Sequence, residues 1–229
     1  ILLLFSMTLF ACGQKGTSET TVPVTEVKKA PATTAPLFDA DSAYLYVKNQ
    51  VDFGPRVPNT KEHVACGNYL AKQLKDFGAQ VTDQYADLIA YDGTLLKARN
   101  IIGSYKPDNK KRIALFAHWD TRPWADNDPD EKNHKTPILG ANDGASGVGA
   151  LLEIARLINQ QQPQLGIDII FLDAEDYGAH DQNNEASWCL GAQYWARNPH
   201  VQGYNARFGI LLDMVGGKNT VFLKESYSE

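Results

Sequence analysis

The sequence has 229 residues, of which 43% are hydrophobic and 21% are charged, and its formal net charge is −5. This composition is ordinary for a globular protein and excludes a collagen-like or fully disordered chain. The mild acidity, without a basic stripe, argues against nucleic acid as a partner. The length predicts one domain, or at most two small ones.

The chain begins with an apolar run, ILLLFSMTLFA (1–11). The run is too short to span a membrane and has the apolar core of a secretory signal, without an initiator Met or a preceding basic residue. It ends at Ala11-Cys12-Gly13, which resembles a bacterial lipobox. We therefore predict an incomplete lipoprotein signal over residues 1–12, with Cys12 as the lipidated residue. The alternative is an ordinary signal peptide with an incidental cysteine.

Residues 13–36 are rich in Thr, Ser, Pro, Lys and Ala and offer little apolar surface to bury, which is typical of a flexible linker. We expect residues 37–229 to fold as one domain. The signal predicts export as a bacterial membrane-anchored lipoprotein facing the periplasm or the cell exterior. In an oxidising compartment Cys66 and Cys189 either form a disulfide or stay as two buried thiols, and the sequence leaves both open.

Helical spacing of apolar residues predicts a first helix over 41–51 and a second from about residue 60 to Gly78. We expect Asn59 to cap the second helix, with Glu62 three residues later as its capping-box partner. Gly78 suits the position just after the helix. The two helices precede all the predicted strands.

Two mixed segments, 79–90 and 94–104, flank Asp92-Gly93, which predicts a β-hairpin. Three apolar runs typical of buried strands follow. The later elements are strands 112–118, 166–172 and 207–212, a helix marked by Val148 to Ile158, and a helix around 188–197. This alternation predicts an α/β fold of three layers, with helices on both faces of a mixed, mainly parallel central sheet.

Polar residues follow each of the three predicted buried strands, and one more precedes a helix. They are His118, Asp120, Asp143, Glu175, Asp176 and Asp213, together with Asp173. In open α/β sheets, ligands bind beyond the carboxyl ends of the strands. Carboxylates brought together there repel one another unless a cation neutralises them or some stay protonated. A set of His and carboxylate ligands suits Zn²⁺, so the sequence predicts a metal site.

Each residue also has an ordinary structural explanation. Asp143 could cap the helix that follows it, His118 could be a hydrogen-bonded structural residue, and Glu175-Asp176 could be a solvated loop. Asp213 lies between apolar residues, which places it in or beside the core. A buried carboxylate without a partner is costly there. The coincidence of all of them at one sheet edge favours the metal site.

The chain from Phe53 to Glu229 resembles a known family. The similarity is carried by FGPRVPNT (53–60), AHWDTRPWAD (117–126), LGANDGASGVGALLEIAR (139–156), FLDAEDYG (171–178), WCLGAQYWA (188–196) and LLDMVGG (211–217). These blocks resemble the zinc-dependent clan that contains bacterial aminopeptidases and the animal-type glutaminyl-peptide cyclotransferases, or glutaminyl cyclases. Within that clan the chain looks like the bacterial lipoprotein-type cyclases, so the resemblance implies a zinc-aminopeptidase-like fold.

The resemblance also implies roles. Asp143 and Asp176 would be zinc ligands, with Asp176 standing where the clan commonly has Glu. Glu175 would be the general acid/base. Asp213 would join a hydrogen-bond network beside the substrate in a cyclase, or bind a second metal in an aminopeptidase.

His118 and its neighbour Asp120 would likewise lie near the site in a cyclase, or His118 would bind the second metal in an aminopeptidase. The remaining zinc ligand of the family is a His, which we expect beyond Glu229. We therefore expect the catalytic domain over 37–229 to lack its C-terminal part, and these residues alone to bind zinc weakly.

The implied reaction converts the N-terminal Gln of a peptide to pyroglutamate and releases ammonia, with one Zn²⁺ as Lewis acid. The implied partners are peptide or protein N-termini that start with Gln, and a membrane through the lipid anchor. One alternative is an aminopeptidase with two zinc ions. A second alternative is a tethered binding module without catalytic activity.

Overall fold

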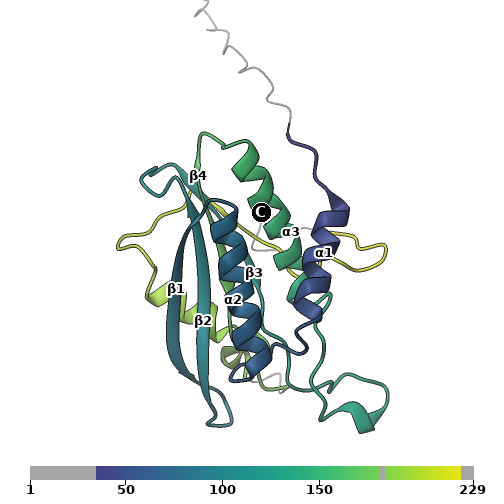
Figure 1. Ribbon diagram of the computed structural model, residues 1–229. Helices are drawn as coiled ribbons and strands as arrows, with labels where there is room; N and C mark the ends of the chain where they lie inside the picture. Colours follow the sequence, from purple (N-terminus) through teal and green to yellow (C-terminus); the bar gives the residue numbers. More distant parts are fainter. Residues whose placement is uncertain (1–34, 181–183, 223–229) are drawn as a thin grey trace, which may run out of the picture. The chain divides into compact units, whose positions relative to one another are not determined.

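The computed structural model of the protein describes residues 35–180 and 184–222. The predicted lipoprotein signal with Cys12, and nearly all of the predicted linker, lie outside the described residues. From Pro36 onward the chain forms one unit, in which helices pack against a central sheet (Figure 1). Within the described ranges, the helices are all too short or too polar to cross a membrane.

The sheet has five strands in the order β1-β2-β4-β3-β5. Their bounds are β1 Gln80–Ile89, β2 Leu95–Tyr105, β3 Arg112–His118, β4 Gly166–Leu172 and β5 Gly209–Leu211. The pairs β1–β2 and β2–β4 are antiparallel, whereas β3 pairs in parallel with both β4 and β5. The predicted hairpin and the mixed sheet are therefore confirmed. The two central parallel strands have the bounds that their apolar runs predicted.

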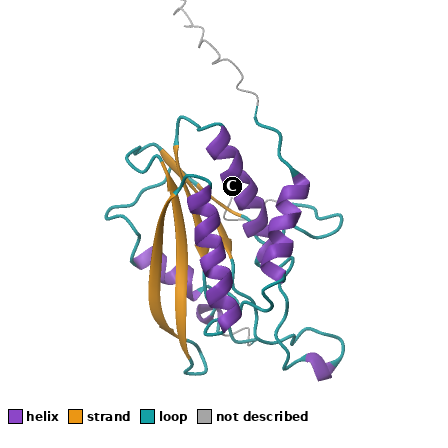
Figure 2. Cartoon of the chain, viewed as in Figure 1, coloured by secondary structure: helices purple, strands orange, loops and turns teal. Residues whose placement is uncertain are grey.

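Helices cover both faces of the sheet (Figure 2). They are α1 Ala40–Val51, α2 Lys61–Asp76, α3 Ala145–Gln160 and α4 Leu190–Arg197, with short 3₁₀ helices at Glu131–Asn133 and Glu185–Ser187. Ile169 and Phe171 of β4 join the core formed with α2 and α3. Ile170, on the opposite face of the same strand, belongs to the cluster that contains Trp195 of α4. Because successive strand residues point to opposite faces, this pattern confirms three layers.

The start of α2 differs from the prediction by one residue. Thr60, not Asn59, is the N-cap, and its hydroxyl accepts the amide N–H of His63 at 3.2 Å. Asn59 adopts a left-handed conformation with φ of 75°, and its side chain bonds to the backbone at the start of β2. The expected capping box between Asn59 and Glu62 is therefore wrong, because the hairpin takes the Asn59 side chain.

The third predicted buried strand is a short strand at the edge of the sheet. β5 has three residues, and Ile210 and Leu211 are 45% and 61% exposed. Among the described residues β5 pairs only with β3. The Asp213 side chain that follows is 41% exposed and contacts the buried His118, so it lies beside the core and not in it. An apolar run shows what a strand could bury and does not show what covers it.

The two remaining cysteines are both free thiols. Cys66 is fully buried in α2, and Cys189 immediately precedes α4. Of the two arrangements that the sequence left open, the structure has the unpaired one.

Candidate active site

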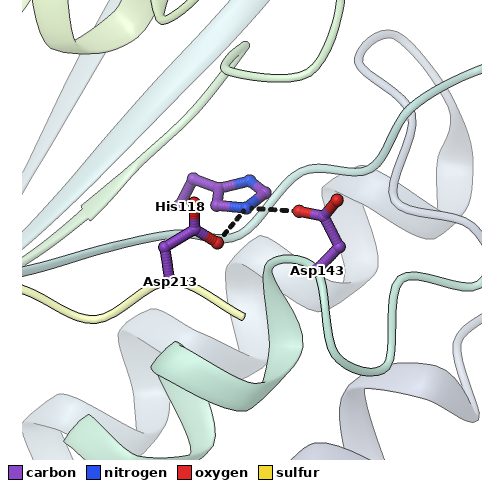
Figure 3. A group of neighbouring side chains, drawn as sticks. All are labelled: His118, Asp143 and Asp213. Atoms are coloured by element: carbon purple, nitrogen blue, oxygen red, sulfur yellow. Dashed lines mark ion pairs between the residues drawn. The ribbon is translucent and has the colours of Figure 1, made fainter. Parts of the chain in front are cut away.

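The polar residues at the strand ends converge on His118, the last residue of β3. Its Nε2 lies 2.9 Å from Oδ1 of Asp143, which precedes α3, and 3.4 Å from Oδ1 of Asp213, which follows β5 (Figure 3). On the other side of the ring, Nδ1 lies 3.6 Å from Oδ1 of Asp120 and 4.0 Å from Oε2 of Glu175. The imidazole thus lies among four carboxylates. The predicted convergence at this sheet edge is confirmed.

These carboxylates change the protonation of His118. Its side chain is only 4% exposed, and burial alone would lower the pKa of the ring. The carboxylates of Asp120, Asp143 and Asp213 outweigh burial and raise the pKa of His118 well above its usual value. The acidic neighbours therefore favour the charged form of the ring.

Asp120 supports the loop that follows β4. Its carboxylate is fully buried and accepts the backbone N–H groups of Glu175 and Asp176, each at 3.1 Å. Burial raises the pKa of Asp120, but the nearby ring of His118 and these two amides outweigh it and lower the pKa overall. A charged Asp120 is therefore in direct contact with the backbone of the acidic pair.

The acidic pair itself is largely buried, with side-chain exposure of 25% for Glu175 and a residue exposure of 5% for Asp176. Burial raises the pKa of Glu175. Burial, followed by the charges of Asp120 and Asp143, raises the pKa of Asp176 to about 9. The Oδ2 atom of Asp176 is buried without a hydrogen-bond partner. The alternative of an ordinary solvated loop is therefore wrong.

The two other structural explanations also fail. The N-cap of α3 is Gly144, and no side chain caps this helix, so Asp143 is not a helix cap. Neither ring nitrogen of His118 makes a hydrogen bond of acceptable geometry, although carboxylate oxygens lie close by. His118 is therefore not an ordinary, fully bonded structural histidine.

The buried polar atoms without hydrogen-bond partners, and the imidazole and carboxylate ligands around them, fit a metal ion. Two groups of possible ligands share His118, with all donor atoms of a group within 4.8 Å of one another: His118, Asp143 and Asp213, and His118, Glu175 and Asp176. The predicted ligands Asp143 and Asp176 fall in different groups that meet at the imidazole. Nitrogen and carboxylate donors in this combination are typical of zinc sites. His118 supplies a donor in addition to the two that the resemblance assigned.

Two arginines that the sequence did not single out hold the loops of the site. Arg56, fully buried, donates to three backbone carbonyls within 119–140 at 2.6 to 3.2 Å. Arg122 donates to the carbonyls of Asp176 and Gly178 at 2.9 and 3.1 Å. Both arginines lie inside sequence blocks that carry the family resemblance. This position was the sequence feature that could have identified them.

Asp173, the first polar residue after β4, has a different role from its neighbours. Both its carboxylate oxygens lie 2.9 Å from Nε2 of His63, whose ring stacks on Trp119 at 4.2 Å. Burial raises the pKa of Asp173. His63 thus holds Asp173, the first residue of the loop after β4, and this buried pair supplies no atom to the two ligand groups.

Comparison with known families agrees with this arrangement. Residues 100–229 match peptidase family M28. The chain belongs to this family.

Among the solved structures similar to this chain are proteins named as glutaminyl cyclases and proteins named as Zn-dependent exopeptidases. The chain is 84% identical to a glutaminyl cyclase of Bacteroides thetaiotaomicron, solved with N-acetylhistamine bound, over 85% of this chain and 68% of that chain, with a TM-score of 0.83. It is 64% identical to a Zn-dependent exopeptidase of Parabacteroides distasonis over 85% of this chain and 68% of that one, also with a TM-score of 0.83. These similarities confirm the predicted zinc-aminopeptidase-like α/β fold.

A curated relative is more distant. The glutaminyl-peptide cyclotransferase of Drosophila melanogaster is 25% identical over 188 residues, which are 78% of this chain and 50% of the relative. The chain thus spans about half the length of this curated relative.

Proposed function

We propose that the protein is a zinc-dependent glutaminyl-peptide cyclotransferase, which converts N-terminal Gln to pyroglutamate and releases ammonia. The observation that carries the proposal is the position of Glu175. It is a partly buried carboxyl group with a raised pKa, next to Asp176 and within 4.0 Å of His118, in the donor cluster. The high identity to a protein named as a glutaminyl cyclase supports this reaction among those that such a site could catalyse.

Asp143 and Asp176 would hold the zinc ion, and His118 lies close to both. When bound, zinc would polarise the carbonyl of the substrate's side-chain amide and stabilise the negative charge that develops on its oxygen. We propose one ion per chain. Asp213 supports this number because it is ion-paired with His118 and is half-exposed, as expected for a group that contacts substrate.

Glu175 would move the proton that the reaction transfers. The α-amino nitrogen of the substrate attacks the side-chain amide carbon, so a C–N bond forms and the ring closes. Glu175 takes a proton from the attacking nitrogen and gives it to the departing nitrogen as the original amide C–N bond breaks and ammonia leaves. A carboxyl group with a raised pKa suits both steps, because it holds a proton more readily than an ordinary carboxylate and can pass it on.

The substrates proposed are peptide and protein N-termini that begin with Gln. Both reacting groups belong to one residue, so the site has to hold the amine and the carbonyl in attack geometry and needs no second substrate. We also propose that the protein is exported and held at a bacterial membrane by lipid on Cys12. Residues 1–12 support this through their resemblance to a lipoprotein signal.

An aminopeptidase is the second candidate. It is favoured by the two ligand groups that share His118, because two such groups could hold two ions. The relative named as a Zn-dependent exopeptidase also favours it.

The test is to incubate the protein with a Gln-initiated peptide and measure ammonia and free amino acids. We expect ammonia in equal amount to pyroglutamyl peptide, one zinc per chain, and loss of turnover in Glu175→Gln. Glu131→Gln, an exposed change in the 3₁₀ helix, serves as the matched control and keeps full activity. Free amino acid without ammonia, together with two zinc ions, would establish the peptidase instead.

A further inference from the structure

We propose that Cys189 is a positioning residue for Glu175: its thiol donates a hydrogen bond to the carboxylate and fixes the side chain in the orientation that proton transfer needs. The inference rests on the proposed function, in which Glu175 is the acid/base. It gives a role to a residue that neither ligand group contains. Cys189 lies 14 positions after Glu175 in the sequence.

The backbone brings the two residues together. The amides of residues 189–191, where α4 begins, donate in reverse order to the carbonyls of residues 173–175, at 3.0 to 3.1 Å. This ladder joins the first turn of α4 to the segment that carries Glu175. The two backbone segments lie close together at Gly191, since a Cβ on this residue would lie 2.1 Å from the carbonyl oxygen of Asp173.

Both sides of this ladder carry backbone strain. Ala174 has φ of 51° and Cys189 has φ of 56°, in the left-handed region that residues with a Cβ seldom adopt. Such conformations cost about 1 to 3 kcal/mol each and persist only where the surrounding contacts enforce them. Here the left-handed conformation of Cys189 points its side chain toward the carboxylate of Glu175.

The side-chain contact completes the arrangement. The Sγ atom of Cys189 lies 3.2 Å from Oε1 of Glu175, within reach of a thiol hydrogen bond. The other oxygen, Oε2, lies on the side of His118, 4.0 Å from Nδ1. The two oxygens therefore have different partners, which leaves Oε2 free to face the reacting nitrogen atoms while Oε1 is held.

The thiol is suited to this role because it keeps its proton. Burial, together with the charge of Glu175, raises the pKa of Cys189 to about 12. At neutral pH the group is a neutral donor and places no second negative charge beside the acid/base. Cys66, the other free cysteine among the described residues, lies in the core and makes no comparable contact with any of them.

The test compares Cys189→Ala with Cys189→Ser in the full-length protein. Both variants keep a Cβ, so the strained turn is the same, and only Ser keeps a donor. We expect Cys189→Ala to lower kcat by about three- to ten-fold with KM within about two-fold, and Cys189→Ser to restore kcat to within about two-fold. Gln193→Ala is the control on the same helix: it removes the hydrogen bonds that the side chain donates to residues 186 and 188 and the one that it accepts from Arg197, and leaves kcat unchanged.

An unchanged kcat in Cys189→Ala, or equal losses in the Ala and Ser variants, would overturn the proposal. The variants are assayed on whichever reaction the wild type catalyses, ammonia release or amino-acid release, so failure of the cyclase assignment is seen separately. A readout independent of turnover is the infrared S–H stretch, isolated as the difference between the wild type and Cys189→Ala. We expect this band to move to higher frequency in Glu175→Ala, and an unmoved band would show that the hydrogen bond does not exist.

Discussion

The buried carboxylate of Asp120 accepts the backbone N–H of Glu175 through Oδ1, at 3.1 Å. Its second oxygen, Oδ2, accepts the N–H of Asp176 at the same distance. The side chain of Asp120, two residues after β3, thus holds the backbone of both Glu175 and Asp176 in the loop after β4. The acid/base and the proposed zinc ligand are oriented together, so a shift of the Asp120 carboxylate would displace both.

Replacing Asp120 with Asn tests this coupling. An amide has one acceptor oxygen, so one of the two N–H groups would face an NH₂ group and the loop would shift. We expect kcat/KM to fall about 10- to 100-fold, with a parallel loss of zinc affinity, as is usual when a group that orients a metal ligand is removed. Steady-state kinetics and zinc titration measure both. Asp87→Asn, an exposed change on β1, is the control and should be neutral; an Asp120→Asn enzyme with wild-type kinetics would refute the coupling.

The sequence predicts the central part of this fold because its signals are strong and local. β3 and β4 are mostly apolar runs that end at or just before polar residues, so their bounds are visible in the sequence. The convergence of His118, Glu175 and Asp143 follows from the rule that parallel strands end at the same sheet edge. These predictions need no knowledge of which side chain touches which.

The parts that sequence did not predict depend on contacts between distant segments. Asn59 and Thr60 are both good helix caps, and the choice between them is made by the backbone of β2. The contact of Cys189 with Glu175 depends on a left-handed turn that no residue pattern marks. The burial of β5 depends on what lies beside it, which its own apolar residues cannot show.

Removal of zinc should make stability depend on pH. In the metal-free protein Asp176 has a pKa of about 9, against about 4 in an unfolded chain, so the folded state binds the additional proton between these values. The free energy of unfolding therefore falls as pH rises from about 4 to about 9. His118, whose pKa is also raised, acts in the same direction above its usual value.

Bound zinc should remove this decline, because it requires the carboxylate without its proton and stabilises that form. We expect the difference in Tm between zinc-loaded and chelator-treated protein to widen between about pH 5 and about pH 9. Thermal unfolding across this range measures it. Zinc addition near pH 7 should also release protons, detected with an indicator dye. A constant difference in Tm and no proton release would contradict the protonated state of Asp176.

Gly147 should be required for the position of Asp213. A Cβ on this residue of α3 would lie 2.1 Å from the carbonyl oxygen of Leu212, so Gly147→Ala must push away the backbone just before Asp213. We expect a loss of about 1 to 3 kcal/mol in stability, as for other overpacked sites, and a larger fall in kcat/KM than this loss explains. Gly93→Ala is the control: it is strained by a φ of 85° but meets open space, at a hairpin tip. It should lose stability and keep activity; equal activity in both variants would refute the role of Gly147.

Asp168 should be important for stability and not for catalysis. Its buried carboxylate, near the start of β4, accepts from Arg112 at 2.6 and 2.7 Å, from Ser104 at 2.6 Å and from Tyr204 at 2.7 Å. Burial raises the pKa of Asp168, but these hydrogen bonds outweigh it and lower the pKa overall, so the stabilisation is present above about pH 4 and is lost as pH falls through the folded-state pKa.

Asp168→Asn would leave the guanidinium of Arg112, 9% exposed, without its counter-charge. We expect the free energy of unfolding at neutral pH to fall by about 3 to 5 kcal/mol, because an unpaired buried charge is far more costly than a missing pair. Urea unfolding measures this, and kcat per folded molecule should not change, since the site lies beyond the opposite end of β4. The exposed pair of Lys72 and Asp76 provides the comparison, and Asp76→Asn should cost less than about 1 kcal/mol. Equal effects of the two substitutions would show that burial does not determine the strength of the Asp168 network.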